Sequence, residues 1–396
     1  QQLLLGVHGS LLRQGHLGQV NLLTRREMLD LVVVEGRAVG VVARNLLSGG
    51  LESYAADAVV IATGGYSSVF QLSTNAIHSN ASAIWRCHRR GAWFANPCFT
   101  QFHPTCLPQL NSAQSKLTLM SESLRNDARV WVPRHSGDER DPRLIPEEER
   151  DYFLERLYPA YGNLVPRDVA SRATRTMVES GLGVGPTGTA VYLDFAEAMG
   201  RVGEGILCER YGNLFAMYRE ITGDNPCQQP MQISPAPHFT MGGLWVDYHL
   251  RSNLEGLFVV GEANCADHGA NRLGANSLLQ TMVDGAFVLP RTLTHELAVK
   301  GRASVCPDDA AFDLCRCQCQ ERIERKLSGQ GKLTAREIHA RLGQILLKHV
   351  GVSRSAAGLP LGRQEIAELQ AEFQQNLRVT GDGVGLNDEL ERAGRV

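Results

Sequence analysis

Six ionisable residues stand out because each lies among small or apolar neighbours. They are His103 in "QFHPT", Glu122 and Arg125 in "SESLRND", Arg167 in "LVPRDVASR", His238 in "PHFTMGG" and Arg272 in "HGANRLGANSLLQ". Taken singly, each has an ordinary explanation as a core histidine, a surface ion pair or a helix-end charge. Two arginines and two histidines around one pocket would hold two carboxylates, because a guanidinium can bind a carboxylate through two hydrogen bonds. Together, the residues predict a site for a small dicarboxylate.

Arg272 lies between small residues and the start of an apolar helix, and this position has two interpretations. Gly269 and Gly274 would allow a plain turn. Alternatively, Arg272 and the backbone N–H groups of the helix N-terminus share one negative ligand. Arg167 is equally open, because "PRD" also begins a helix with Asp168 near its positive end.

Two segments are typical of a strand that runs into glycine, "DAVVIATGG" and "LEGLFVVGEAN". Such endings let a cofactor approach the backbone closely. They would form a shelf for a flavin, with Glu262 as the acceptor for a hydroxyl of its ribose or ribityl chain. A third glycine-rich stretch, "GLGVGPTG" at 181–188, follows a helix and has a proline where a helix should open, so it is interpreted as a loop.

The elements that must position these residues change in character along the chain. Residues 1–15 have a helical pattern, and the β-rich runs "LDLVVVEG", "AVGVVARN" and "DAVVIATGG" follow. From about 108 to 232, charged and proline-bearing loops alternate with helices expected around 149–158 and 166–180. After the second strand–glycine unit, the residues beyond 294 have helical spacing.

This order predicts an α/β (α+β) fold, in which a Rossmann-like FAD-binding domain is interrupted by an inserted capping domain and followed by a helical domain. The expected FAD-binding domain comprises 1–103 and 235–294. The capping or substrate domain is expected at 104–234 and the helical domain at 295–396.

Composition narrows the class of protein. The chain has 396 residues, 43% of them hydrophobic, and a formal net charge of -2, so no basic excess points to nucleic acid. No apolar run approaches the ~20 residues of a membrane-spanning helix, so any membrane attachment would come through another subunit. The 10 cysteines lack the paired spacing of a disulfide scaffold, which favours a reducing compartment. Cys315, Cys317 and Cys319 in "CRCQC" are one residue apart rather than two, so no metal site is predicted there.

The motifs "ATGG", "QFHPT", "SESLRND", "PRDVASR", "HFTMGG", "VVGEAN" and "HGANRLGANSLL", in this order, resemble the flavoprotein subunit of succinate dehydrogenase and fumarate reductase. The resemblance covers nearly the whole chain. The segments "NPCFTQFHPT", "SKLTLMSESLRNDARVWVP" and "GNLFAMY" are most similar to the bacterial branch with a cytochrome b anchor. The resemblance implies bound FAD, succinate or fumarate as substrate, and partnership with an iron–sulfur subunit and a cytochrome b membrane anchor. It also implies a place at the cytoplasmic face of the bacterial inner membrane.

The resemblance further implies a role for individual residues. The dicarboxylate-binding positions are His103, Ser121, His238 and Arg272. Arg167 matches a proton-transferring arginine, with Glu122 and Arg125 as its relay to solvent. The flavin-contacting positions are Ala62, Thr63, Gly64, Gly65, Glu262, Ser277 and Leu278. Arg272 would then lie between substrate and cofactor, which favours the anion pocket over the plain turn.

Three features depart from the family pattern. Ser121 stands where threonine is common, and Ser82 stands where many members have a flavin-contacting aspartate. No strand–GxGxxG–helix unit precedes Gln1, and the N-terminal sequence has no signal pattern. We therefore expect a fragment that lacks the pyrophosphate cradle and any histidine bonded to FAD, and that does not retain FAD when expressed alone.

Two competing interpretations have different consequences. The first is L-aspartate oxidase, a soluble relative that usually has cysteine at the position of Met241. The second is a non-catalytic remnant of the fold. Such a remnant would be expected to have lost Arg167, His238 or Arg272, and all three are present.

Overall fold

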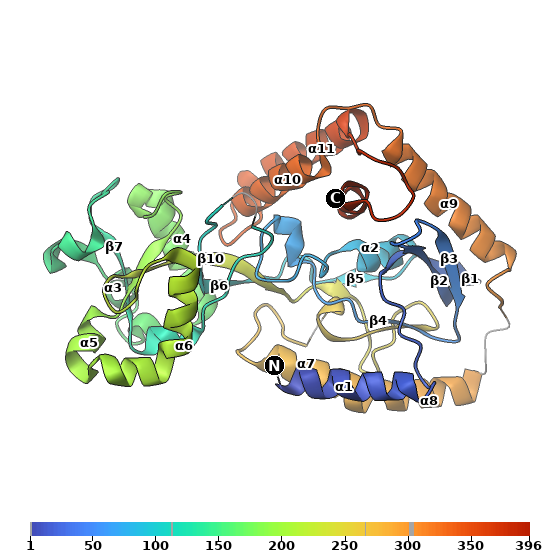
Figure 1. Ribbon diagram of the computed structural model, residues 1–396, viewed down its shortest axis with the longest axis horizontal. Helices are drawn as coiled ribbons and strands as arrows, with labels where there is room; N and C mark the ends of the chain where they lie inside the picture. Colours follow the sequence, from blue (N-terminus) through green and yellow to red (C-terminus); the bar gives the residue numbers. More distant parts are fainter. Residues whose placement is uncertain (1, 112–113, 266, 301–304) are drawn as a thin grey trace.

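A computed structural model of the chain describes residues 2–111, 114–265, 267–300 and 305–396. Three regions are visible: small sheets in the middle, a capping region at one end around a larger sheet, and a layer of helices from the last part of the chain (Figure 1). The chain enters the capping region through one long strand and returns through another. The predicted architecture, an interrupted α/β domain followed by helices, is confirmed.

The middle region contains three small sheets. The antiparallel sheet of order β1-β2-β3 comprises β1 (Arg26–Val34), β2 (Arg37–Asn45) and β3 (Leu51–Ala55). The two-stranded sheets pair β4 (Val59–Ile61) with β12 (Leu257–Val259), and β5 (Phe94–Ala95) with β11 (Gly243–Leu244). β4 and β12 are parallel, with Ile61 opposite Val259. Both glycine-bearing segments therefore leave their strands at the same edge.

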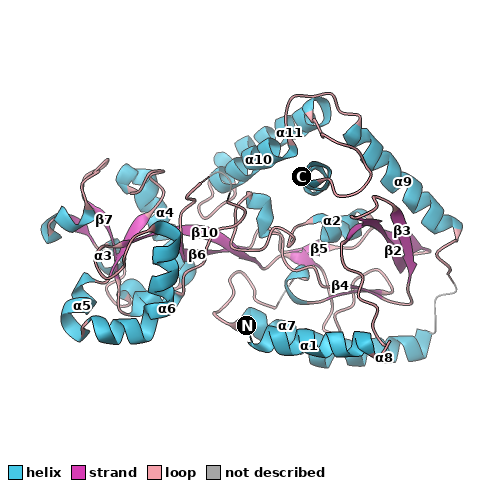
Figure 2. Cartoon of the chain, in the orientation of Figure 1, coloured by secondary structure: helices cyan, strands magenta, loops and turns pink. Residues whose placement is uncertain are grey.

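The capping region is built on a sheet of order β6-β10-β9-β7-β8. Its strands are β6 (Thr100–Cys106), β10 (Met231–Thr240), β9 (Val191–Asp194), β7 (Arg129–Pro133) and β8 (Arg150–Asp151). β6 and β10 run from this sheet into the middle region (Figure 2). They are antiparallel and place Ala236 opposite His103, so His238 lies near His103. This strand pair thus delivers both histidines to the boundary between the two regions.

The helices of the capping region pack against the same sheet. They are α3 (Phe153–Leu157), α4 (Arg167–Met177), α5 (Ala196–Val202) and α6 (Glu204–Thr222). Ser171 on α4 donates to the carbonyl of Phe102 at 3.1 Å, which holds α4 on β6. The helix expected around 149–158 is shorter than predicted, because Asp151 pairs with Val132 in β8. Arg150 also donates to Asp194 at 3.2 Å, which fixes the start of this segment as strand.

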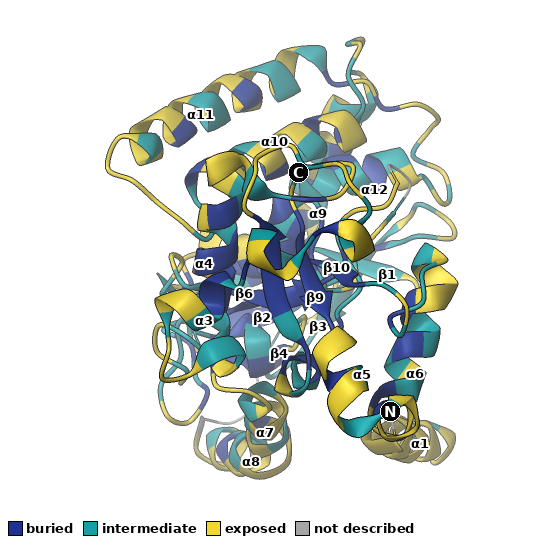
Figure 3. Cartoon of the chain, turned by 90° about the vertical axis from the view of Figure 1, so that its left-hand side faces the viewer, coloured by how far each residue is buried: buried dark blue, intermediate teal, exposed yellow. Residues whose placement is uncertain are grey.

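The remaining helices form two outer layers, except α2, which lies in the middle region against β1. They are α1 (Gln2–His16), α2 (Ser82–Arg89), α7 (Asn276–Val283), α8 (Leu289–Lys300), α9 (Ala310–Leu327), α10 (Ala335–His349), α11 (Gly358–Asn376) and α12 (Asp388–Arg395). α9 to α12 share a core that includes Ile338 and Leu369. Buried residues concentrate on β6, β9, β10 and α4, whereas α1, α7 and α8 are largely exposed (Figure 3). Within the described ranges, no helix is both long and apolar enough to cross a membrane.

Candidate active site

The two histidines face each other where β6 and β10 leave the capping sheet. Their ring centroids are 5.2 Å apart and the ring planes are inclined by 73°. The hydroxyl of Thr105 lies 3.2 Å from Nδ1 of His103, and the hydroxyl of Thr74 lies 2.8 Å from Nδ1 of His238. Both rings are therefore oriented by a contact at Nδ1.

Burial sets the charge state of these rings. It lowers the pKa of His103 to about 2, and the nearby His238 and Arg167 add to this effect. It lowers the pKa of His238 to about 4, with further contributions from Arg272 and Arg167. Both rings are consequently neutral near pH 7, so they would bind a carboxylate as hydrogen-bond donors rather than as cations.

Arg272 is a buried cation that has neutral partners. Its Nη2 donates to Oε1 of Gln101 at 2.9 Å and its Nη1 donates to Oγ of Ser277 at 3.1 Å. Its guanidinium carbon lies 4.6 Å from the ring centroid of Phe239. Among the described residues it forms no ion pair with a carboxylate, and its buried Nε has no hydrogen-bond partner. A buried charge without a counter-ion is costly, so this position suits an anionic ligand.

Gln101 holds the segment that carries Arg272. Its side-chain amide donates to Oδ1 of Asn271 at 2.7 Å and to the carbonyl of Arg272 at 2.6 Å. Neither Gln101 nor Thr74 was singled out from the sequence. One signal was available, because Gln101, His103 and Thr105 are buried polar residues at alternate positions of one strand and therefore share a face.

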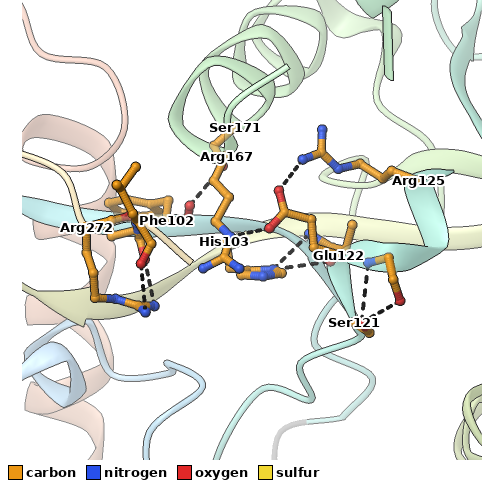
Figure 4. Close-up of polar contacts among 12 residues, drawn as sticks. Phe102, His103, Ser121, Glu122, Arg125, Arg167, Ser171 and Arg272 are labelled. Atoms are coloured by element: carbon orange, nitrogen blue, oxygen red, sulfur yellow. Dashed lines mark hydrogen bonds and ion pairs between the residues drawn. The ribbon is translucent and has the colours of Figure 1, made fainter. Parts of the chain in front are cut away.

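Arg167, Glu122 and Arg125 form a continuous chain of charges (Figure 4). Arg167 begins α4, and its Nε donates to one carboxylate oxygen of Glu122. Arg125 donates to the other oxygen through Nη2. Nη1 of Arg125 donates to the carbonyl of Asn163 at 2.7 Å and to that of Val165 at 3.1 Å. Glu122 is thus held between two guanidinium groups.

The chain of charges meets the histidine pair and the Arg272 segment. The ring of His103 lies beside the contact between Arg167 and Glu122 in the view of the site (Figure 4). Gly274 approaches Arg167 so closely that a Cβ atom there would lie 3.3 Å from Nη2. Ser121 caps the short helix that begins at Glu122, because its hydroxyl accepts from the amide of Ser123 at 3.3 Å. All of the predicted dicarboxylate and proton-transfer residues therefore lie around one place, although their roles stay predictions.

The predicted flavin-contacting residues lie on the edge formed by β4 and β12. Gly64 has a φ of 74°, a conformation that favours glycine, and a Cβ atom on Gly65 would lie 2.2 Å from Oε1 of Glu262. Glu262 accepts from the amide of Thr240 at 2.9 Å, and burial raises its pKa to about 7. Ala62 and Thr63 are exposed beside this cradle.

The start of α7 connects this edge to the anion site. Ser277 accepts a hydrogen bond from Arg272, and the next residue, Leu278, is 56% exposed. The accessible backbone after β4 and the apolar surface of α7 fit a flavin ring placed beside Arg272. The residues that would hold it are Ala62, Thr63, Gly64, Gly65, Glu262, Ser277 and Leu278.

Comparisons with known proteins show which families and which fold the chain matches. A family model described as FAD binding domain matches residues 1–278, and one described as Fumarate reductase flavoprotein C-term matches residues 339–396. The chain is 36% identical over 380 residues to the succinate dehydrogenase flavoprotein subunit of Bacillus subtilis, covering 95% of this chain and 61% of that protein. It is 32% identical to L-aspartate oxidase 2 of Ralstonia nicotianae, covering 85% of this chain and 54% of that protein. A mutant of E. coli quinol fumarate reductase FrdA superposes with a TM-score of 0.77 and 27% identity, covering 93% of this chain and 60% of that one. The chain thus spans between 54% and 61% of the length of these relatives.

Proposed function

The chain belongs to the family of FAD-binding flavoproteins that includes the succinate dehydrogenase and fumarate reductase flavoprotein subunits, and on that premise we propose that it interconverts succinate and fumarate. One observation supports this most strongly. Arg272 is buried without a carboxylate partner among the described residues, beside two neutral histidines and close to Arg167. A small dianion would supply the missing negative charge.

Substrate binding divides between the two sides of this site. One carboxylate pairs with Arg272, whose orientation is fixed by Gln101 and Ser277. The other accepts hydrogen bonds from His103 and His238 and from the hydroxyl of Ser121. When bound, FAD supplies the acceptor for the hydride that leaves one methylene carbon of succinate. Two anchored carboxylates restrict rotation of the substrate, so that the two reacting carbons keep fixed positions.

Arg167, at the start of α4, carries out the proton transfer. Arg167 gives its Nε proton to Glu122, to which that nitrogen already donates, and takes up in its place the proton that leaves the second methylene carbon. Guanidinium groups rarely lose a proton, so the proton must be handed on in the same step, and the carboxylate of Glu122 contacts Arg167 directly and can receive it. Arg125 also lines a surface cleft of about 410 Å³, which gives the relay an exit to solvent.

The same proposal includes partners and a location. One of the similar solved structures, 27% identical to this chain, is described as a quinol-fumarate reductase with menaquinol molecules. Because the chain is similar to a succinate dehydrogenase flavoprotein subunit, electrons from it would pass to an iron–sulfur subunit, and a cytochrome b anchor would hold the assembly at the cytoplasmic face of the inner membrane.

The test is an activity assay on the protein encoded by the complete open reading frame. Succinate should reduce an artificial dye, and fumarate should oxidise the reduced dye. Without turnover with either dicarboxylate in a flavin-loaded preparation, the proposal would be abandoned. The likeness to L-aspartate oxidase supplies a second candidate, which predicts instead that aspartate generates hydrogen peroxide from oxygen while succinate is inert.

A further inference from the structure

Two cysteines of the capping region come together with a glutamate, away from the site described above. Cys208 lies on α6, Glu204 begins the same helix, and Cys227 lies in the segment between α6 and β10. The two Sγ atoms and a carboxylate oxygen of Glu204 all lie within 4.8 Å of one another. Glu204 and Cys208 are exposed and Cys227 is half-buried, so solvent reaches the cluster.

Local structure holds these three side chains in place. Glu204 and Cys208 are four residues apart on a helix and therefore share a face. Gly223, with a φ of 85°, ends α6 and lets the chain reverse. Cys227 then packs against the hydrophobic core of the capping region, and its amide donates to Oδ1 of Asn225 at 3.1 Å. The face of α6 that carries Glu204 and Cys208 thus meets the segment that carries Cys227.

A second cluster of the same composition provides a contrast. Asp30, Cys315 and Cys319 are also close enough to share an ion, and all three are buried. Arg90 and Arg322 both pair with Asp30 at 2.9 Å, and Nη2 of Arg322 lies 3.1 Å from Sγ of Cys319. Two guanidinium groups therefore already supply positive charge, and a divalent cation there would be repelled.

The cluster at Glu204 has no such cation. Within the part of the chain that the structure describes, no arginine, lysine or histidine makes an ion pair or hydrogen bond to its three ligand atoms. Three acidic groups thus face one another with nothing positive between them.

We propose that Glu204, Cys208 and Cys227 bind a Zn²⁺ ion through two thiolates and one carboxylate, with water in the fourth position. Zinc accepts this donor set in tetrahedral geometry, and thiolate ligands select it over magnesium or calcium. The ion would tie the start of α6 to the segment that leads into β10, the strand that carries His238. This proposal is independent of the proposed function, because none of the three residues contacts the dicarboxylate site.

The experiment measures Zn²⁺ and Co²⁺ binding to the complete gene product, purified metal-free under reducing conditions. Zn²⁺ is titrated against a chromophoric chelator, and Co²⁺ is used to detect thiolate-to-metal charge transfer by absorbance. We expect Cys208→Ser and Cys227→Ser each to weaken binding of one zinc equivalent by more than the roughly 10- to 100-fold that loss of an outer-shell partner costs, and to weaken the charge-transfer band, since one thiolate remains. Glu204→Gln should weaken binding while the band remains.

Cys317→Ser is the matched control, because Cys317 is an exposed cysteine on α9 outside both clusters. It should bind Zn²⁺ as the unmodified protein does, and circular dichroism should show that every variant is folded. Unchanged Zn²⁺ affinity in both Cys208→Ser and Cys227→Ser would overturn the proposal. The proposal would also be overturned if mass spectrometry found a Cys208–Cys227 disulfide, and no bound metal, in protein purified under reducing conditions.

Discussion

Two groups of charged residues in this chain differ in whether every arginine has a carboxylate partner. Around Asp30, the carboxylate accepts two hydrogen bonds from Arg90, at 3.0 and 2.9 Å, and another from Arg322 at 2.9 Å. At the proposed dicarboxylate site, the carboxylate of Glu122 pairs with both Arg167 and Arg125, while Arg272 has only neutral partners among the described residues. Every arginine of the first group pairs with a carboxylate, so we call it the balanced group, whereas Arg272 in the second group forms no ion pair among the described residues. A buried cation without a counter-ion therefore separates a candidate binding site from a structural ion network.

The largest effect is expected at Arg167, because this residue would move a proton as well as carry charge. Arg167→Ala should reduce succinate turnover by about 10²- to 10⁴-fold, the usual contribution of a positioned general base. Dicarboxylate affinity should change much less. Steady-state kinetics combined with a binding titration would separate the two quantities.

A neighbouring arginine provides the control for this experiment. Arg172 lies on the same helix, is exposed and pairs with Asp168 at 2.9 Å. Arg172→Ala should leave turnover intact. Near-normal turnover in Arg167→Ala would remove Arg167 from the mechanism. The chain of charges formed by Arg167, Glu122 and Arg125 would then have only a structural role.

Arg272 is the arginine without a carboxylate partner, so its substitution tests the comparison directly. Arg272→Met would leave a carboxylate of the bound ligand buried without its ion pair, which costs roughly 2–5 kcal/mol, or about 30-fold to several thousand-fold in affinity. Calorimetry with succinate or malonate measures this. Arg90→Met, in the balanced group, should leave the affinity unchanged. Equal affinity in Arg272→Met and the unmodified protein would exclude Arg272 from the pocket.

A substitution in the balanced group should instead lower the free energy of unfolding. Asp30→Asn removes the negative charge between Arg90 and Arg322, which are each about one quarter exposed. Partial hydration of these arginines limits the loss to about 1–3 kcal/mol of unfolding free energy. Chemical denaturation measures that loss, and dicarboxylate affinity should remain as it was. A variant with unchanged stability but weakened ligand binding would contradict the distinction between the two groups.

Much of the fold could be predicted because its signals are local. Alternating apolar residues and glycine endings indicated β1, β2 and β4, and the helical pattern at the N-terminus indicated α1. The shortened α3 was missed because its boundary depends on Asp151 pairing with Val132, a contact outside the segment.

The candidate site was predictable to a different extent. Its charged residues were conspicuous because polar groups stood among apolar ones, and the structure brings them together. Gln101 was missed because its importance depends on Arg272, which is 171 residues away. The approach of Cys208 to Cys227 was likewise unpredictable, since it depends on how the chain returns after Gly223.

The smallest expected effect concerns pH and the neutral histidines. Burial and the nearby Arg272 lower the pKa of His238 to about 4, so the free site binds almost no proton there above about pH 5. A bound dianion favours the charged ring and raises this pKa, so the complex binds more protons than the free site. By linkage, dicarboxylate affinity should then rise as the pH falls from about 7.5 to about 5.5, by up to about tenfold. Titrations across this range measure the slope, and His238→Gln should flatten it without removing the contribution of Arg272. A slope of opposite sign would mean that His238 does not face the ligand and that Arg272 alone supplies the charge of the pocket.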